Sequence, residues 1–149
     1  MRFRLDPREM TDEASRLAWV DEVAGAATRE AVSRGLPEED VYYLSAAIRE
    51  ALMNALFHGR SPDGEPWVRV DVGCQGASNL VVTVRDQGPG FDPASIPDPG
   101  TAECCGRSHG RGLFFMRRFT DRLSFAFPGP GGSLVRLEKR LPARDDLTD

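Results

Sequence analysis

The fold prediction rests first on residues 38–57, which read EEDVYYLSAAIREALMNALF. Apolar side chains recur there at spacings of three and four, which is typical of a helix with one face on a protein core. The members of this apolar stripe are Val41, Leu44, Ile48, Leu52 and Ala55. Because His58-Gly59 is a suitable C-terminal stop, we predict a helix over about Glu38–Phe57.

Glu50 and Asn54 lie four residues apart in this helix, so they share one of its faces. That face is opposite the apolar stripe, and an ordinary solvent-exposed surface is the simpler interpretation. An exposed surface usually carries more charge than this one does. Its other residues are Ala46, Ala47, Ala51 and Phe57. The Glu50–Asn54 pair is therefore a candidate functional site.

Helix and strand signals extend on both sides of this stretch. Upstream, the sequence predicts a short strand over Arg2–Leu5 and a helix that begins after Thr11 as its N-cap and ends at Gly35. Downstream, alternating apolar residues predict two strands that Gly73–Asn79 connects as a hairpin. The apolar residues of these strands are Val68, Val70 and Val72, then Leu80, Val82 and Val84.

The C-terminal part of the chain begins with a long loop over Asp86–Gly112, which is rich in Gly, Pro, Asp and Ser. A loop of this length in a compact domain is usually functional or disordered. A short helix is predicted from Leu113 onward. After it we expect a strand through Leu123, Phe125 and Phe127, a turn over Pro128–Gly132 and a last strand over Ser133–Arg140.

This order of elements predicts an α+β two-layer sandwich, in which helices cover one face of a mostly antiparallel, mixed sheet. The polar alternation in both hairpins indicates that the other face is partly solvated. The chain has 149 residues, which is the size of one domain. We predict a single domain over residues 1–142 and a flexible tail over residues 143–149.

Composition disfavours several classes of protein. Hydrophobic residues make up 40% and charged residues 28% of the chain, close to the globular average. No apolar run approaches the roughly 20 residues of a membrane-spanning helix, and Met1–Pro7 has no apolar signal core, so we expect a cytoplasmic protein without membrane contact. The net charge of −4 argues against direct nucleic-acid binding, and three cysteines argue against a secreted disulfide framework.

The segment Asp86-Gln87-Gly88-Pro89-Gly90 directly follows a predicted strand. Aspartate followed by two spaced glycines is a turn signal in itself, and a simple turn is an equally good interpretation. In a binding site, the glycines would let the backbone approach a ligand closely. Asp86 would then be a fixed hydrogen-bond acceptor, suited to an exocyclic amine such as that of adenine.

A second glycine-rich segment, Gly106–Leu113, leads into the predicted short helix. A helix N-terminus offers free backbone N–H groups and a positive dipole end, which suit a phosphate. Arg107 and Arg111 could add charge-assisted hydrogen bonds. A flexible connection is the alternative. The segment is not a Walker A loop, since no Gly-Lys-Ser/Thr follows, and no βαβ unit surrounds it as a dinucleotide fingerprint requires.

Together, three motifs resemble a known pattern. The motifs Glu50-x-x-x-Asn54, Asp86-x-Gly88-x-Gly90 and Gly110-x-Gly112-Leu113 are similar to the N, G1 and G2 boxes of the GHKL, or Bergerat-fold, ATPases. Within that superfamily the chain resembles the bacterial anti-sigma-factor serine/threonine kinases of the RsbW type. The resemblance covers about residues 8–141, including the ending over Gly132–Leu137.

The resemblance implies an ATP site with a catalytic carboxylate. Asn54 would hold Mg²⁺, and Asp86 would accept a hydrogen bond from the adenine amine. Glu50 would act as general base or orienting group for a substrate serine hydroxyl. Phosphoryl transfer needs mostly positioning and charge neutralisation, so one carboxylate with Mg²⁺ is a sufficient set.

The resemblance also assigns nucleotide contacts around these residues. Gly88 and Gly90 would shape the adenine wall, and Ser133 would reach adenine through water. Residues 94–109 would form a lid, with His109 at the ATP site. The residues whose backbone N–H groups would cradle the phosphates are Gly110, Arg111, Gly112 and Leu113.

The partners implied by the resemblance are ATP or ADP, a sigma factor, an anti-sigma antagonist of the STAS type with a phosphorylatable serine, and a second copy of the chain in a homodimer. The alternative is a nucleotide-binding regulatory module of the same fold that sequesters a partner without transferring phosphate. Phosphate appearing on a protein substrate in a Glu50-dependent way would distinguish the two.

Three further interpretations are disfavoured. A stand-alone histidine kinase needs a phosphoacceptor histidine outside the ATP site, and His58 and His109 both fall at that site. A gyrase-type or MutL-type ATPase would continue into a transducer domain. A metal site built from Cys104, Cys105 and His109, with Cys74 or His58, matches no structural zinc spacing.

Overall fold

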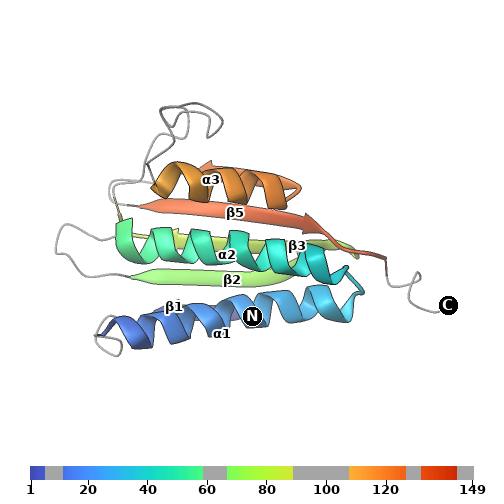
Figure 1. The fold of residues 1–149 in the computed structure, drawn as a ribbon, viewed down its shortest axis with the longest axis horizontal. Helices are drawn as coiled ribbons and strands as arrows, with labels where there is room; N and C mark the ends of the chain where they lie inside the picture. The colour runs from blue at the N-terminus through green and yellow to red at the C-terminus, as the bar shows by residue number, and fades with distance from the viewer. Residues whose placement is uncertain (6–11, 59–66, 89–107, 127–131, 144–149) are drawn as a thin grey trace.

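The structure is a computed structural model that describes residues 1–5, 12–58, 67–88, 108–126 and 132–143 (Figure 1). These residues form three helices and five strands. The helices are α1 (Glu13–Ser33), α2 (Glu38–His58) and α3 (Ser108–Phe119). The strands are β1 (Arg2–Leu5), β2 (Val68–Gln75), β3 (Asn79–Asp86), β4 (Arg122–Ala126) and β5 (Ser133–Arg140). None of the described helices is long and apolar enough to cross a membrane.

The five strands form one sheet in the order β1-β2-β3-β5-β4. All four pairings are antiparallel, so the described strands contain no parallel pair and the sheet is not mixed there. Along β2 and β3, buried residues alternate with partly exposed ones. The predicted α+β sandwich is therefore confirmed, with one covered sheet face and one open face.

Helix α2 is the middle of the helical layer, with α1 on one side and α3 on the other (Figure 1). Its predicted apolar stripe packs on the sheet, with Leu44, Ile48 and Leu52 almost fully buried. The same core cluster includes residues of α1, α3, β2, β3 and β5. The covered face of the sheet thus holds a single core, which fixes α2 and α3 relative to β3 and β5.

Some predicted boundaries are wrong by a few residues. The N-cap of α1 is Asp12 rather than Thr11, because the Asp12 carboxylate accepts a hydrogen bond from the Ser15 N–H at 2.7 Å. The β2–β3 turn spans only residues 76–78, with Gly76 at a φ of 69°, so the strands are longer than the predicted hairpin allowed. The predicted turn over residues 128–131 lies outside the described residues.

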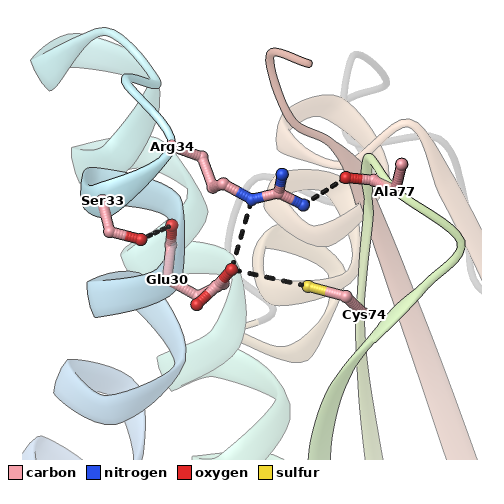
Figure 2. A network of polar contacts seen from close by, with 5 residues as sticks. All are labelled: Glu30, Ser33, Arg34, Cys74 and Ala77. Atoms are coloured by element: carbon pink, nitrogen blue, oxygen red, sulfur yellow. Dashed lines mark hydrogen bonds and ion pairs between the residues drawn. The ribbon is translucent and has the colours of Figure 1, made fainter. Parts of the chain in front are cut away.

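Arg34 ties the C-terminal end of α1 to the β2–β3 turn (Figure 2). The residue is only 4% exposed. Its Nε donates to Glu30 Oε1 at 3.2 Å, and its Nη2 donates to the carbonyl oxygen of Ala77. The same Glu30 oxygen accepts from the Cys74 thiol at 3.8 Å. These hydrogen bonds hold the C-terminal end of α1 against β2 and the β2–β3 turn.

Candidate functional site

Asp86 is held in a fixed orientation at the end of β3. It lies opposite Ser133, the first residue of β5, in the register of the two strands. The Ser133 hydroxyl donates to Asp86 Oδ2 at 2.8 Å, and the Gly88 N–H donates to Oδ1 at 2.8 Å. Asp86 is 8% exposed. These contacts bring together three of the predicted site residues.

The Asp86 carboxylate keeps acceptor capacity after these two hydrogen bonds. An ionised carboxylate has about four acceptor positions, and two are used here. Burial raises the pKa of Asp86 above its ordinary value, although the hydrogen bonds from Ser133 and Gly88 act in the opposite direction. No arginine or lysine among the described residues forms an ion pair with it. Asp86 is thus a buried acceptor that suits a neutral donor such as an amine.

Glu50, Asn54 and Gly112 meet where α2 and α3 pack together. A Cβ atom placed on Gly112 would lie 2.6 Å from Glu50 Oε2 and 3.7 Å from Asn54 Nδ2. A 2.6 Å approach is shorter than a carbon–oxygen contact allows, so only glycine fits here without moving the carboxylate. Glu50 and Asn54 therefore lie on a partly buried interhelical surface and not on a solvated helix face.

Burial also raises the pKa of Glu50 above its ordinary value. Within the described part of the chain, no hydrogen bond or ion pair satisfies its carboxylate. A partly buried carboxylate with a raised pKa is a stronger base than a solvated one, as general-base catalysis requires. The Glu50 oxygens, together with the side-chain oxygen of Asn54, are also ligands of the kind that Mg²⁺ prefers.

The elements that carry these residues converge at one end of the molecule (Figure 1). The C-terminal end of α2, the C-terminal end of β3 and the first residues of α3 and β5 all lie at the end opposite the β2–β3 turn. One end of the fold therefore carries a buried acceptor and a partly buried carboxylate–amide pair. Such a set can hold a polar ligand and accept a proton from a hydroxyl group.

The start of α3 differs from the prediction. The helix begins at Ser108, so the segment before Leu113 that was predicted as a loop is already helical. The N–H groups of Gly112 and Leu113 consequently lie beyond the first turn, where N–H groups normally bond within the helix. Leu113 is a core residue, 3% exposed. The prediction failed because glycine has a low helix propensity, and packing of Gly112 against α2 outweighs it.

Several predicted site residues are only partly described. Gly90 lies outside the described residues, as do Cys104, Cys105 and most of the predicted lid. The backbone of His109, Gly110 and Arg111 belongs to the first turn of α3, but the placement of the His109 and Arg111 side chains lies outside what the structure describes. Their roles at phosphate stay predictions. Within the described ranges no cluster of three or more His, Cys, Asp or Glu is arranged to hold a metal.

Two features of the site were missed by the sequence analysis. The direct hydrogen bond between Ser133 and Asp86 joins residues 47 positions apart, and only the β3–β5 register reveals it. The close approach of Gly112 to Glu50 is the second. The sequence contains one signal for this contact. Gly112 directly precedes the apolar Leu113, and a glycine at such a position lets one helix pack closely on another.

A family model described as histidine kinase-like ATPase domain matches residues 14–139. The chain is 30% identical over 105 residues to anti-sigma F factor of Heyndrickxia coagulans, an alignment that covers 67% of this chain and 69% of that protein.

Solved structures of similar fold have low sequence identity. The SiaB–SiaC complex from Pseudomonas aeruginosa matches with a TM-score of 0.56 at 13% identity, covering 83% of this chain and 84% of that one. The mycobacterial sensor histidine kinase MprB matches with a TM-score of 0.55 at 17% identity, covering 96% and 99%. The histidine kinase domain of the blue-light activated kinase EL346 from Erythrobacter litoralis matches with a TM-score of 0.53 at 22% identity, covering 83% and 60%. These likenesses concern the fold alone.

Proposed function

The chain belongs to the histidine kinase-like ATPase domain family and is a relative of anti-sigma F factor, and from this we propose that it is an ATP-dependent serine/threonine protein kinase that also acts as an anti-sigma factor. Its ligand is ATP, and its reaction is transfer of phosphate to a serine of an antagonist protein. One observation carries the proposal. A buried acceptor, Asp86, and the Glu50–Asn54 pair lie on elements that converge at the same end of the fold.

Asp86 recognises adenine in this proposal. Its carboxylate is oriented by Ser133 and Gly88, and the remaining acceptor positions take the exocyclic amine. Guanine carries a carbonyl oxygen at the corresponding ring position, and two facing acceptors repel each other. We therefore expect the site to select ATP over GTP.

Glu50 is the proposed catalytic residue. Burial that raises its pKa prepares the carboxylate to take the proton of a substrate serine hydroxyl. Asn54, one helical turn further along α2, would hold Mg²⁺ through its side-chain oxygen. The chemistry that Mg²⁺ supplies when bound is neutralisation of phosphate charge. Helix α2 thus carries both the base and the metal ligand, and Gly112 sets the distance of α3 from them.

The proposed partners are a sigma factor and a STAS-type antagonist, and the proposed assembly is a homodimer in the cytoplasm. They follow from the resemblance to RsbW-type kinases and from the name of the relative, anti-sigma F factor. In this proposal the chain sequesters the sigma factor until the unphosphorylated antagonist displaces it. Phosphorylation of the antagonist by the Glu50-dependent reaction would restore sequestration.

The first experiment is calorimetric titration of the wild-type protein with ATP, with and without Mg²⁺, and with GTP. We expect Mg²⁺-dependent binding of ATP that Asn54→Ala loses. The matched control is Ser45→Ala, also on α2. The Ser45 hydroxyl accepts a hydrogen bond from Arg49, and Arg49 pairs with Asp21 of α1. Ser45 therefore lies on the other side of α2 from Asn54. No binding by the folded wild-type protein would contradict the nucleotide site.

The second experiment separates the kinase from a regulatory module that only binds nucleotide. The wild-type protein or its variant is incubated with radiolabelled ATP and purified STAS-domain proteins of the source organism. Phosphoserine is then measured on each STAS-domain protein. We expect wild-type protein to label one of them and Glu50→Ala to bind ATP without labelling it. Labelling at the wild-type rate by Glu50→Ala would remove Glu50 from the catalytic role, and ATP binding without labelling by the wild type would favour the regulatory module.

A further inference from the structure

The open face of the sheet carries two arginines that no acidic group neutralises in the part of the chain that the structure describes. Arg69 on β2 lies directly opposite Arg85 on β3, and the Cα partner of Arg69 on β1 is Arg4. Like charges directly opposite each other on neighbouring strands are destabilising. This arrangement is therefore unfavourable in the free protein.

The acidic residues of the same face are engaged by other arginines. Asp71 pairs with Arg2 at 2.8 Å. Glu138 lies 3.6 Å from Arg122 and 3.5 Å from Arg136. Neither carboxylate has a described contact with Arg69 or Arg85. The charge of the Arg69–Arg85 pair thus has no counterpart on this face, among the residues that the structure describes.

Arg69 is also held in place with an unused donor. Its guanidinium lies over the Trp67 ring, 5.6 Å from the ring centroid, as in a cation–π contact. Its Nε atom is buried and has no hydrogen-bond partner among the residues that the structure describes. A buried donor without a partner costs free energy, and a movement of the side chain that brings this donor to a bound anion would remove the cost. Both features indicate an anionic group bound beside Arg69.

A shallow hollow, wide open to solvent and about 670 Å³ in volume, lies beside this pair on the same face. Asp71 and Thr83, two residues from Arg69 and Arg85 along their strands, contribute to its lining, as do Gly73 and Val81. A Cβ atom on Gly73 would meet nothing within 4 Å, so this glycine leaves open space. The hollow offers polar and apolar contacts to the residues on one side of the anionic group.

We propose that the open sheet face docks an acidic segment of a partner protein, with a carboxylate bound between Arg69 and Arg85 and the neighbouring residues in the hollow over Gly73. Arginine guanidinium groups suit carboxylates because they can donate two parallel hydrogen bonds. This surface is separate from the nucleotide site, which lies on the covered face.

The binding test uses a fluorescein-labelled hexaglutamate peptide, with hexaserine as the uncharged probe, measured by fluorescence polarisation at low salt. We expect the wild-type protein to bind hexaglutamate only. Arg69→Gln and Arg85→Gln should each weaken binding at least tenfold. Arg122→Gln is the matched control, since it removes the same charge from the same face but from an arginine that lies beside Glu138 and does not line the hollow, and we expect less than a threefold change.

A third variant tests the hollow without changing charge. Gly73→Val places a side chain in open space on a strand, where β-branched residues are favoured, so it should fold at least as stably as the wild type. It should nevertheless weaken hexaglutamate binding at least tenfold. Equal losses in Arg122→Gln, undiminished binding in Gly73→Val, or stronger binding of inorganic phosphate or a 15-nucleotide DNA than of hexaglutamate would each overturn the proposal.

A measurement without ligand tests the premise that Arg69 and Arg85 repel each other in the free protein. Arg85→Glu replaces a like-charged pair with an oppositely charged one, so the melting temperature at low salt should rise. A lower melting temperature would show that Arg85 is already neutralised and would overturn the proposal. Neither assay contains nucleotide, so the result is independent of the proposed kinase activity.

Discussion

At the scale of single residues, Gly112 controls the position of the Glu50 carboxylate. We expect Gly112→Ala to lower phosphotransfer at least tenfold, because its Cβ would lie 2.6 Å from Glu50 Oε2 and the carboxylate must move away. The flexible end of the Glu50 side chain can do this at little cost in stability. Alanine also favours a helix over glycine by about 0.5–1 kcal/mol. The melting temperature should therefore stay close to the wild-type value while activity falls.

Gly25→Ala in α1 is the control for Gly112→Ala. A Cβ atom on Gly25 meets nothing within 4 Å, so only the gain in helix propensity remains. Thermal unfolding should show a stabilisation of about 0.5–1 kcal/mol with unchanged phosphotransfer. If Gly112→Ala unfolds at a much lower temperature, or keeps full activity, the contact with Glu50 does not have the proposed role.

Asp86 combines the proposed role in ligand binding with a cost to stability. Its pKa is raised in the folded protein. Between the ordinary aspartate pKa and this raised value, the folded state keeps a proton that the unfolded state releases, so stability falls as pH rises through that range. We expect Asp86→Asn to be at least as stable as the wild type at neutral pH, with the difference shrinking on acidification in a pH series of thermal melts.

The same variant should weaken ATP binding about tenfold to a hundredfold, because an amide nitrogen replaces one oxygen of a charged acceptor. Acidification should also weaken ATP binding to the wild type, once pH falls to the raised pKa of Asp86. Calorimetric titration measures both effects. Asp71→Asn is the control, since this carboxylate lies on the open face and pairs with Arg2. Equal losses in both variants would argue against a specific role for Asp86.

At the scale of elements, α1 is anchored to the sheet by Arg34. We expect Arg34→Ala to destabilise the fold by about 1–3 kcal/mol, because it removes hydrogen bonds to Glu30 and Ala77 from a buried position. Arg29→Ala, at an exposed position one turn earlier, should change stability by less than about 0.5 kcal/mol. Chemical denaturation measures both, and equal effects would contradict the anchoring role.

The elements themselves could largely be predicted from the sequence, because their apolar periods are strong. The α2 stripe and the alternation in β2 and β3 directly reflect burial on one side. The start of α3 was missed because intrinsic propensity disfavours Gly110 and Gly112 in a helix, while contact with α2 decides the outcome. Glu50, Asn54 and Asp86 could be chosen by motif. Gly112 and Ser133 could also be chosen by the resemblance, but their contacts with Glu50 and Asp86 depend on helix packing and strand register, which no local pattern contains.

At the scale of the whole molecule, one core joins both layers of the described fold. The core cluster draws on all three helices and on β2, β3 and β5. We expect thermal unfolding to be a single two-state transition, with equal calorimetric and van't Hoff enthalpies. Saturating Mg²⁺-ATP at a hundredfold excess over its dissociation constant should add about 2.7 kcal/mol of stability. Two separate transitions would show that α3 and β4 unfold independently of the rest.

The pairing of Ser133 with Asp86 across β3 and β5 has a consequence for how genes of this kind can change in length. A strand shows alternate residues to opposite faces, so one added codon just after Ser133 would turn its hydroxyl toward the open face while Val135 and Leu137 keep their places. Insertions of one codon at this point should therefore yield folded protein that has lost the hydrogen bond from Ser133 to Asp86, and with it the proposed adenine contact. Added residues in a surface loop cost little, whereas this position cannot gain one without losing the contact between Ser133 and Asp86.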